Sequence, residues 1–326
     1  MSRRTTGDPH PVTDLKIGVN LWSQRCTWAQ FLDAAQRVDR LGYRSLWTWD
    51  HLNAIFGDPS QDIWEAYTTL GAWAQATRNV EIGLMVGANT FRNPGIVAKG
   101  IATLDHISGG RAILGIGGAW FEYEHTAHGI DFGSGFGERL DWMDESVAAM
   151  TALLAGETVS SNEGDHYAFR DLRHSPQPVR RVPVMIGGTG RRKTLRTLAK
   201  YGDMWNAFGT PAQVAELDQV LREHCDAVGR DQAEIERTAN LWMVIRDDPK
   251  EAERVWLAQM AHNGETPESV GSDSRPLLGT PEMIAERLRE YVAVGFDGLI
   301  VEMPTPFDQE TIERLIGEVK PMVDAA

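Results

Sequence analysis

The stretch Pro183-Val-Met-Ile-Gly-Gly-Thr-Gly-Arg-Arg-Lys-Thr-Leu-Arg-Thr-Leu-Ala-Lys200 places a short apolar strand directly before three glycines and a basic helix. Arg191, Arg192 and Lys193 stand where that helix is expected to begin. A helix start already carries about half a positive charge, so cations there are unfavourable unless an anion lies nearby. Backbone N–H groups of the Gly187–Gly190 turn would complete a phosphate site. The alternative is a surface helix whose basic side chains face water.

Composition narrows the class of protein. The chain has 326 residues, 42% of them apolar, and can bury a large core. A net charge of -14 and a pI near 5.1 argue against nucleic acid or an anionic membrane as partner. Cys26 and Cys225 form no disulfide framework and have no metal-ligand spacing. Without an apolar run long enough for a membrane span or an export signal, we expect a cytoplasmic protein that acts on a small molecule.

Strand and helix patterns alternate along the whole chain. Apolar runs predict eight strands, and the segments between them have helical spacing or helix caps. The expected strands are 16–22, 45–49, 80–86, 111–117, 182–186, 203–208, 238–246 and 298–303. This order predicts a parallel (β/α)₈ TIM barrel, with a doubly wound open sheet as the alternative.

Two connections are longer than barrel turns require. They span residues 119–181 and 247–279, and such insertions after barrel strands usually build lids or substrate walls. No interdomain linker is visible, so we expect one domain over residues 1–326 with a polar lead-in at 1–15.

Chemistry in such a barrel lies where the strands end. The second strand ends in Trp49-Asp50-His51, which favours His51 as a proton donor or as a hydrogen-bond donor to a cofactor ring. Asp50 would fix the tautomer of His51 or touch the cofactor. The alternative is a loop histidine that caps the next helix.

The segment after the fourth strand, Gly115-Ile-Gly-Gly-Ala-Trp-Phe-Glu-Tyr-Glu-His125, lacks the third glycine of a dinucleotide fingerprint. Its acids and histidines match no metal motif, so no metal is expected. Tryptophans near strand ends would line an aromatic cavity for a flat ring: Trp22, Trp49, Trp120 and Trp205.

Several of these strand-end motifs resemble one family. Residues 85–94, 111–125, 183–206, 279–282 and 295–297 look like the luciferase-like monooxygenase superfamily, in its branch that uses the deazaflavin coenzyme F420. The resemblance covers most of the chain and keeps the order of the motifs. It implies hydride transfer at the deazaflavin C5 to or from a small organic substrate, in a protein that is commonly a homodimer.

The resemblance also implies roles for individual residues. A non-proline cis peptide is expected at Met85–Val86, or else at Val86–Gly87. Proton donors would be His51 first and then Glu122 or Glu124. The family's sugar-phosphate dehydrogenases have a glutamate where this chain has Trp120, so their substrate does not carry over. The implied cofactor contacts are Asp50, Met85, Val86, Gly87, Asn89, Gly117, Gly118, Ala119, Trp120, Gly187, Gly188, Thr189, Gly190 and Arg191.

Other functions remain open from the sequence. The same fold can hold FMN and act as a monooxygenase with a partner reductase, because a phosphate site serves either cofactor. A sugar-phosphate isomerase or an aldolase without a redox cofactor would need a Schiff-base lysine or an acid/base pair at the strand ends, and the expected strands contain no lysine beyond Lys16. A binding module without catalytic activity is a further alternative.

Overall fold

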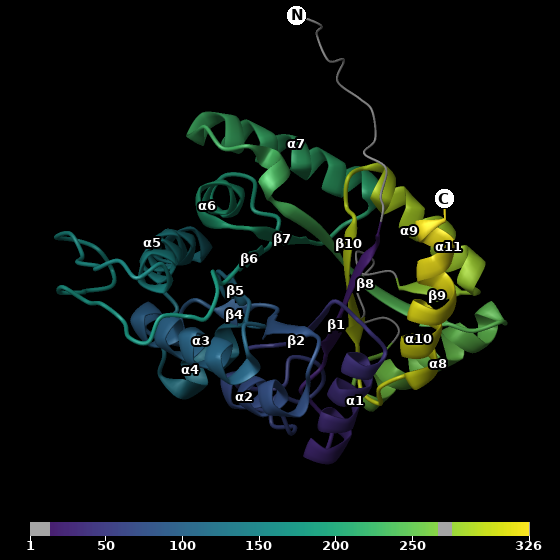
Figure 1. The fold of residues 1–326 in the computed structure, drawn as a ribbon. Coiled ribbons are helices and arrows are strands. Elements are labelled where there is room, and N and C mark those ends of the chain that lie inside the picture. Colours follow the sequence, from purple (N-terminus) through teal and green to yellow (C-terminus); the bar gives the residue numbers. More distant parts are fainter. Residues whose placement is uncertain (1–13, 267–275, 326) are drawn as a thin grey trace, which may run out of the picture.

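The computed structural model describes residues 14–266 and 276–325. It is a barrel of parallel strands surrounded by helices (Figure 1). The strands are β1 (Lys16–Leu21), β2 (Ser45–Thr48), β3 (Glu81–Leu84), β4 (Gly87–Ala88), β5 (Leu114–Gly117), β6 (Val184–Gly187), β7 (Met204–Ala207), β8 (Glu236–Ile245), β9 (Leu277–Gly279) and β10 (Gly298–Met303).

The strand order is β3-β2-β1-β10-β8-β7-β6-β5-β4, and β9 pairs with β8 outside this path. A parallel bridge between Ile82 and Ala112 joins the two ends of the order. The expected strand 80–86 is observed as β3, which ends at Leu84, and the strand resumes as β4 at Gly87, beyond the expected end; the Met85–Val86 peptide between them is cis, as expected. With β3 and β4 counted as one interrupted strand, the path contains the eight predicted strands. The TIM-barrel prediction is confirmed, and the open doubly wound sheet is wrong.

Helices cover the outside of the barrel, and their ends follow sequence signals. Thr280 caps the helix that begins with Pro281, as the sequence predicts, and Thr27 and Thr210 form capping boxes. No helix in residues 14–266 or 276–325 is long and apolar enough to cross a lipid bilayer. The helices are α1 (Trp28–Arg40), α2 (Ala66–Ala76), α3 (Pro94–Ser108), α4 (Glu122–His128), α5 (Phe136–Leu154), α6 (Thr194–Tyr201), α7 (Pro211–Val228), α8 (Pro249–His262), α9 (Pro281–Ala293), α10 (Gln309–Arg314) and α11 (Lys320–Asp324).

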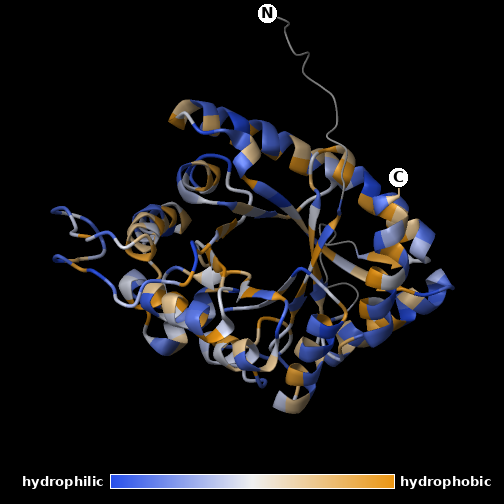
Figure 2. Cartoon of the chain, viewed as in Figure 1, coloured by the Kyte–Doolittle hydropathy of each residue, from blue (hydrophilic) through white to orange (hydrophobic). Residues whose placement is uncertain are grey.

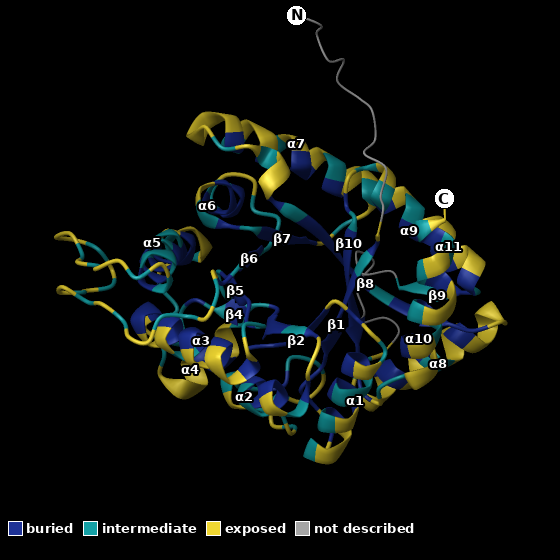
Figure 3. Ribbon diagram, viewed as in Figure 1, coloured by how far each residue is buried: buried dark blue, intermediate teal, exposed yellow. Residues whose placement is uncertain are grey.

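The described core has three parts: a large one between barrel and helices, a smaller one inside the barrel, and an aromatic cluster that includes Trp22, Trp49 and Trp256. Figure 3 shows the strands buried and the outward helix faces exposed, and Figure 2 shows polar and apolar residues sharing each surrounding helix. Such two-faced helices bury one side against the strands. Inside the barrel, large side chains form a separate buried cluster: Trp47, Met85, Ile113, Met185, Met204 and Ile300. The barrel is therefore a filled core, and room for a ligand remains only at its end.

The long connections contain structure of their own. Segment 119–181 holds α4 and α5 and then a loop in which Val159 and Leu172 form an antiparallel bridge. Segment 247–279 holds α8 and β9, although residues 267–275 lie outside the described residues. Of the expected lead-in at 1–15, only residues 14 and 15 are described.

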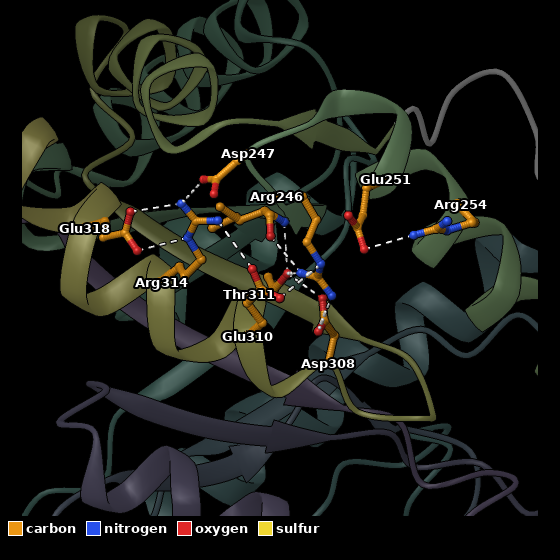
Figure 4. A network of polar contacts seen from close by, with 10 residues as sticks. Arg246, Asp247, Glu251, Arg254, Asp308, Glu310, Thr311, Arg314 and Glu318 are labelled. Atoms are coloured by element: carbon orange, nitrogen blue, oxygen red, sulfur yellow. Dashed lines mark hydrogen bonds and ion pairs between the residues drawn. The ribbon is translucent and has the colours of Figure 1, made fainter.

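An ion-pair network fastens the end of β8 to α10 (Figure 4). The Arg246 guanidinium lies 2.8 Å from Asp308 and 3.2 Å from Glu310. Arg314 lies 2.6 Å from Asp247 and 2.9 Å from Glu318. The Arg246 and Asp308 side chains are 10% and 9% exposed, so removing either partner would leave a nearly buried charge unpaired, which costs more than breaking a surface pair.

Candidate functional site

A cavity of about 390 Å³ lies at the carboxyl ends of the barrel strands. This is the end at which TIM-barrel enzymes carry out chemistry, and the volume is in the usual range for a small-molecule site. Most of the residues singled out from the sequence line it: Asp50, His51, Met85, Val86, Gly87, Gly117, Gly118, Ala119, Trp120, Glu124, Gly187 and Gly188. Outside its lining lie Glu122, Asn89, Thr189, Gly190 and Arg191.

One side of the cavity is built around Val86, which follows the cis peptide. A Cβ on Gly117 would lie 2.5 Å from Val86 Cγ2, and one on Gly187 would lie 2.8 Å from Val86 Cγ1. The two glycines therefore leave the room that the valine side chain fills. Gly188 has a φ of 124°, so its backbone direction also depends on glycine. The result is an apolar wall with exposed backbone, a surface that suits a flat ring.

Asp50 is buried below this wall and is paired with Arg92. Its oxygens accept hydrogen bonds from Arg92 at 2.9 and 2.7 Å and from the Ala88 backbone N–H at 2.9 Å. Burial raises the pKa of Asp50, and the Arg92 guanidinium opposes that rise. Arg92 also pairs with Glu65 at 2.8 Å and lies 4.6 Å from the centre of the Tyr67 ring. Asp50 is thus the buried end of a charge network that reaches the surface at Glu65 and links the ends of β2, β4 and α2.

His51 has a different partner from the one expected. Its Nδ1 lies 2.9 Å from Oε1 of Glu124, whose other oxygen accepts the Leu52 backbone N–H at 2.8 Å. Because a carboxylate only accepts, Nδ1 of His51 carries a proton and donates to Glu124, and the tautomer that this contact favours has Nε2 as its acceptor. Glu124 takes the orienting role expected for Asp50, so only the cofactor contact of Asp50 stays a prediction. Trp120 packs edge-on against His51 with ring centres 5.7 Å apart.

The other polar residues of α4 lie apart from this pair. Glu122 is exposed and does not line the cavity, so the structure offers it no position for proton transfer there. His125 is buried and bonds to Thr90 at 2.6 Å and to the Phe121 carbonyl at 2.9 Å. Within the described part of the chain, no three His, Cys, Asp or Glu side chains are arranged to hold a metal ion.

The basic stretch after β6 differs from its expected form. Helix α6 begins at Thr194, one turn later than expected, because residues 191–193 form a turn. The basic side chains of this stretch pair with acidic side chains of α5 and α7. The distances are 2.7 Å for Lys193 and Asp141, 2.8 Å for Lys200 and Asp144, and 3.7 Å for Arg191 and Glu216. These pairs account for much of the local positive charge without a bound anion.

In the glycine turn at 187–190, one backbone N–H group is already hydrogen-bonded within the protein. The Gly188 N–H donates to the Asn206 carbonyl at 3.0 Å, which removes one of the groups expected to bind phosphate. A phosphate role for the turn at 187–190 stays a prediction. It now depends on backbone groups beyond Gly188 and on the position of the turn at the edge of the cavity.

The sequence argument missed the opposite side of the cavity. Glu302, Asn240 and Trp242 line it together with Phe56 and Asn206. One signal in the sequence could have identified this side: the otherwise apolar strand Gly298-Leu-Ile-Val-Glu-Met303 contains a carboxylate. A buried charged group needs hydrogen-bonding or charged partners, which indicates a polar cluster around it.

The four strand-end tryptophans divide between the cavity and the core. Trp49 and Trp120 line the cavity, as expected. Trp22 is fully buried next to it and donates from Nε1 to Glu302 at 2.7 Å. Trp205 packs in the outer core against Phe296 and donates to the Gly188 carbonyl at 2.9 Å, so its expected place in the cavity is wrong. Its side chain points outward because it alternates with the inward-facing Met204 and Asn206.

Comparison with known proteins identifies the family. The model of the luciferase-like monooxygenase family matches residues 12–298. The chain belongs to the luciferase-like monooxygenase family. That membership confirms the resemblance seen in the strand-end motifs, and the family's barrel agrees with the strand order described above.

Curated relatives and solved structures are similar to this chain over most of its length. The chain is 27% identical to an F420-dependent glucose-6-phosphate dehydrogenase of Kineococcus radiotolerans, over 95% of this chain and 97% of that protein. Among solved structures, an F420-dependent secondary alcohol dehydrogenase in complex with an F420-acetone adduct matches with a TM-score of 0.80 and 22% identity, over 95% of this chain and 99% of the other. The coenzyme F420 dependent tetrahydromethanopterin reductase of Methanopyrus kandleri matches with a TM-score of 0.78 and 19% identity, over 94% and 99%. At these identities the solved structures support the fold.

Proposed function

We propose that this protein is an F420-dependent oxidoreductase that transfers a hydride between the deazaflavin C5 and a small organic substrate. The observation that carries the proposal is one cavity that joins the apolar wall at Val86 to the hydrogen-bonded pair of half-buried His51 and buried Glu124. The F420-dependent relatives support the choice of cofactor.

The residues present fit a deazaflavin. Gly117 and Gly187 let the Val86 side chain pack closely against the neighbouring strands, so the cavity has a smooth apolar wall on which a flat ring can lie. The turn at 187–190 lies at the cavity edge and would hold the side-chain phosphate, and exposed Arg191 and Arg192 would attract the acidic tail. When bound, F420 supplies a ring that accepts or gives a hydride at C5.

The chain's own part is orientation and proton handling. Glu124 holds the His51 ring with Nδ1 protonated, which presents Nε2 as the group that accepts or returns a substrate proton. Trp120 and Phe136, 61% and 51% exposed, stand at the cavity entrance and would cover the bound molecules from water.

The same geometry weakens one alternative function and leaves the other to a binding experiment. The cavity lining contains no lysine among the described residues, so a Schiff-base aldolase has no nucleophile there. FMN would fit the apolar wall as well as F420 does, and only binding distinguishes the two cofactors.

The test is reconstitution of the purified protein with each cofactor. Saturable F420 binding, followed by deazaflavin absorbance and fluorescence, together with much weaker FMN binding supports the proposal. Tight FMN binding without F420 binding contradicts it and favours the monooxygenase alternative.

We also propose that the protein works in the cytoplasm as a homodimer. Both cysteines are buried free thiols, which fits a reducing compartment. The dimer rests on the family resemblance, and light scattering of the purified protein at several concentrations tests it.

A further inference from the structure

The cavity floor opposite Val86 is a cluster of hydrogen-bond acceptors. Glu302 is 5% exposed, and its Oε2 accepts from Asn20 Nδ2 at 2.8 Å and from Trp22 Nε1 at 2.7 Å. Its Oε1 accepts from Asn240 Nδ2 at 2.8 Å. Three strands, β1, β8 and β10, place these groups together, since Asn20 pairs with Glu302 across β1 and β10. A buried carboxylate is thus held by neutral N–H donors and has no cation among these contacts.

The two amides that hold Glu302 each keep one unused oxygen. Because a carboxylate only accepts, both amide nitrogens must face it, and both oxygens turn away. Asn20 Oδ1 and Asn240 Oδ1 are buried and have no hydrogen-bond partner. Asn20 and Asn240 are 0% and 6% exposed, and Asn240 lines the cavity. A buried acceptor without a partner is unfavourable, so a molecule that brings a donor to this floor gains affinity.

Aromatic side chains enclose the same end. Trp49, Phe56 and Trp242 line the cavity around Glu302, and Trp22 stacks on Phe56 with ring centres 4.5 Å apart. Aromatic faces beside a carboxylate attract cations and pack against neutral carbon skeletons.

The same end of the cavity disfavours a substrate that carries an anionic group. The described residues that line the cavity contain no lysine or arginine, while Asp50, Glu124 and Glu302 bring three carboxyl groups. Transferring a phosphate or carboxylate into such an apolar, acid-lined space costs free energy, and no lysine or arginine among the described lining residues offsets this cost. The substrate end is therefore unsuited to a sugar phosphate.

We propose that Asn240 and Glu302, enclosed by Trp49, Phe56 and Trp242, select substrates whose buried end carries hydroxyl or ammonium donors and no anionic group. Asn20, which lies outside the cavity lining, holds the Glu302 carboxylate in place. This inference rests on the proposed function, because it assigns the substrate class of the same cavity. It separates this chain from the glucose-6-phosphate dehydrogenase to which it is similar.

The experiment uses three small probes on one skeleton: glycerol, its amine analogue serinol and glycerol 3-phosphate. Each is titrated into the F420-loaded protein and into the cofactor-free protein, with tryptophan fluorescence as the readout, because Trp49 and Trp242 line the floor. We expect saturable binding of glycerol and serinol and at least about tenfold weaker binding of glycerol 3-phosphate. Equal or tighter binding of the phosphate overturns the inference, and so does the absence of saturable binding by both other probes.

Variants of Asn240 and Glu302 test separately how the amide and the carboxylate charge contribute to probe binding. Asn240→Leu removes the acceptor oxygen together with the Nδ2 donor to Glu302 and should weaken glycerol and serinol binding about tenfold. Asn240→Ser, whose hydroxyl can both accept and donate, should recover part of it. Glu302→Gln removes the charge and should weaken serinol more than glycerol. Equal probe affinities in wild type and both Asn240 variants would contradict a role for the floor. F420 affinity, measured on the same samples, reports separately on the proposed function, and the cofactor-free titration tests the floor even where F420 does not bind.

Discussion

Nδ1 of His51 lies 2.9 Å from Oε1 of Glu124 and joins the end of β2 to α4 across the cavity rim. Glu124 is buried on α4, and its second oxygen is fixed by the Leu52 backbone N–H. The carboxylate therefore cannot rotate away without losing two hydrogen bonds. This relationship gives the histidine one tautomer and one orientation, as a residue that handles protons requires.

Replacing His51 with alanine should lower turnover about a hundredfold or more while F420 affinity changes little, because the ring's expected task is proton transfer. Glu124→Gln should also lower turnover and shift its pH profile, since glutamine no longer selects the tautomer with Nδ1 protonated. His128→Ala is the matched control on the same helix, because His128 is exposed and bonds only to a backbone carbonyl of α4 in the described structure. Wild-type turnover in His51→Ala would contradict the role.

Arg92→Met should destabilise the fold by about 3–5 kcal/mol, because it leaves the buried Asp50 carboxylate without its cation. The double variant with Asp50→Asn should recover much of that loss, since the unpaired charge is then gone. Arg254→Ala is the control: its pair with Glu251 is largely exposed and should contribute less than about 1 kcal/mol. Urea denaturation measures all of them. Equal effects of Arg92→Met and Arg254→Ala would show that the Asp50 network is not buried as described.

Gly117→Ala should weaken cofactor binding, because the added methyl would lie 2.5 Å from Val86 Cγ2 and force the apolar wall to move. A second change, Val86→Ala, should restore part of the affinity by making room for it. Gly100→Ala in α3 is the control, since a Cβ there meets no atom within 4 Å and should stabilise the helix by about 0.5–1 kcal/mol. F420 titration measures the change in cofactor affinity, and thermal melting measures the change in stability. Unchanged affinity in Gly117→Ala would place the ring elsewhere.

Glu302 should make stability depend on pH in a definite direction. Burial raises the pKa of Glu302, against the N–H donors of Asn240, Asn20 and Trp22 that favour its charged form. The folded protein then binds a proton that the unfolded chain releases, so stability falls as the pH rises from the ordinary glutamate pKa of about 4.3 through the raised value. Glu302→Gln should lack this loss. Melting curves of both proteins between acidic and neutral pH check it, and parallel curves would contradict the raised pKa.

The barrel could be predicted because its signals are local. Apolar strands alternate with helices of regular spacing, and the capping residue Thr280 followed by Pro281 fixes one helix start. Helix α4 was missed because its buried residues are Glu124 and His125, so no apolar period marks it. The split of one expected strand into β3 and β4 at Val86 likewise leaves no periodic signal.

The candidate site could be predicted in outline but not in its pairings. Strand-end position indicated His51, because the carboxyl ends of parallel strands meet at one rim, and the family resemblance added Gly117 and Gly118. The partner of His51 lies 73 residues away, and the cations of the basic stretch pair with α5 and α7; both follow from tertiary packing. Glu302 was not recognised as a site residue because four apolar residues surround it in the strand, and this pattern is typical of an ordinary core strand.

The most direct test of the central claim is a crystal structure of the protein with F420. We predict that the deazaflavin ring lies against Val86 between Gly117 and Gly187, with His51 facing the same space and the phosphate at the turn 187–190. A ring bound outside this cavity, or a cavity that stays closed to F420 while FMN occupies it, would contradict the account.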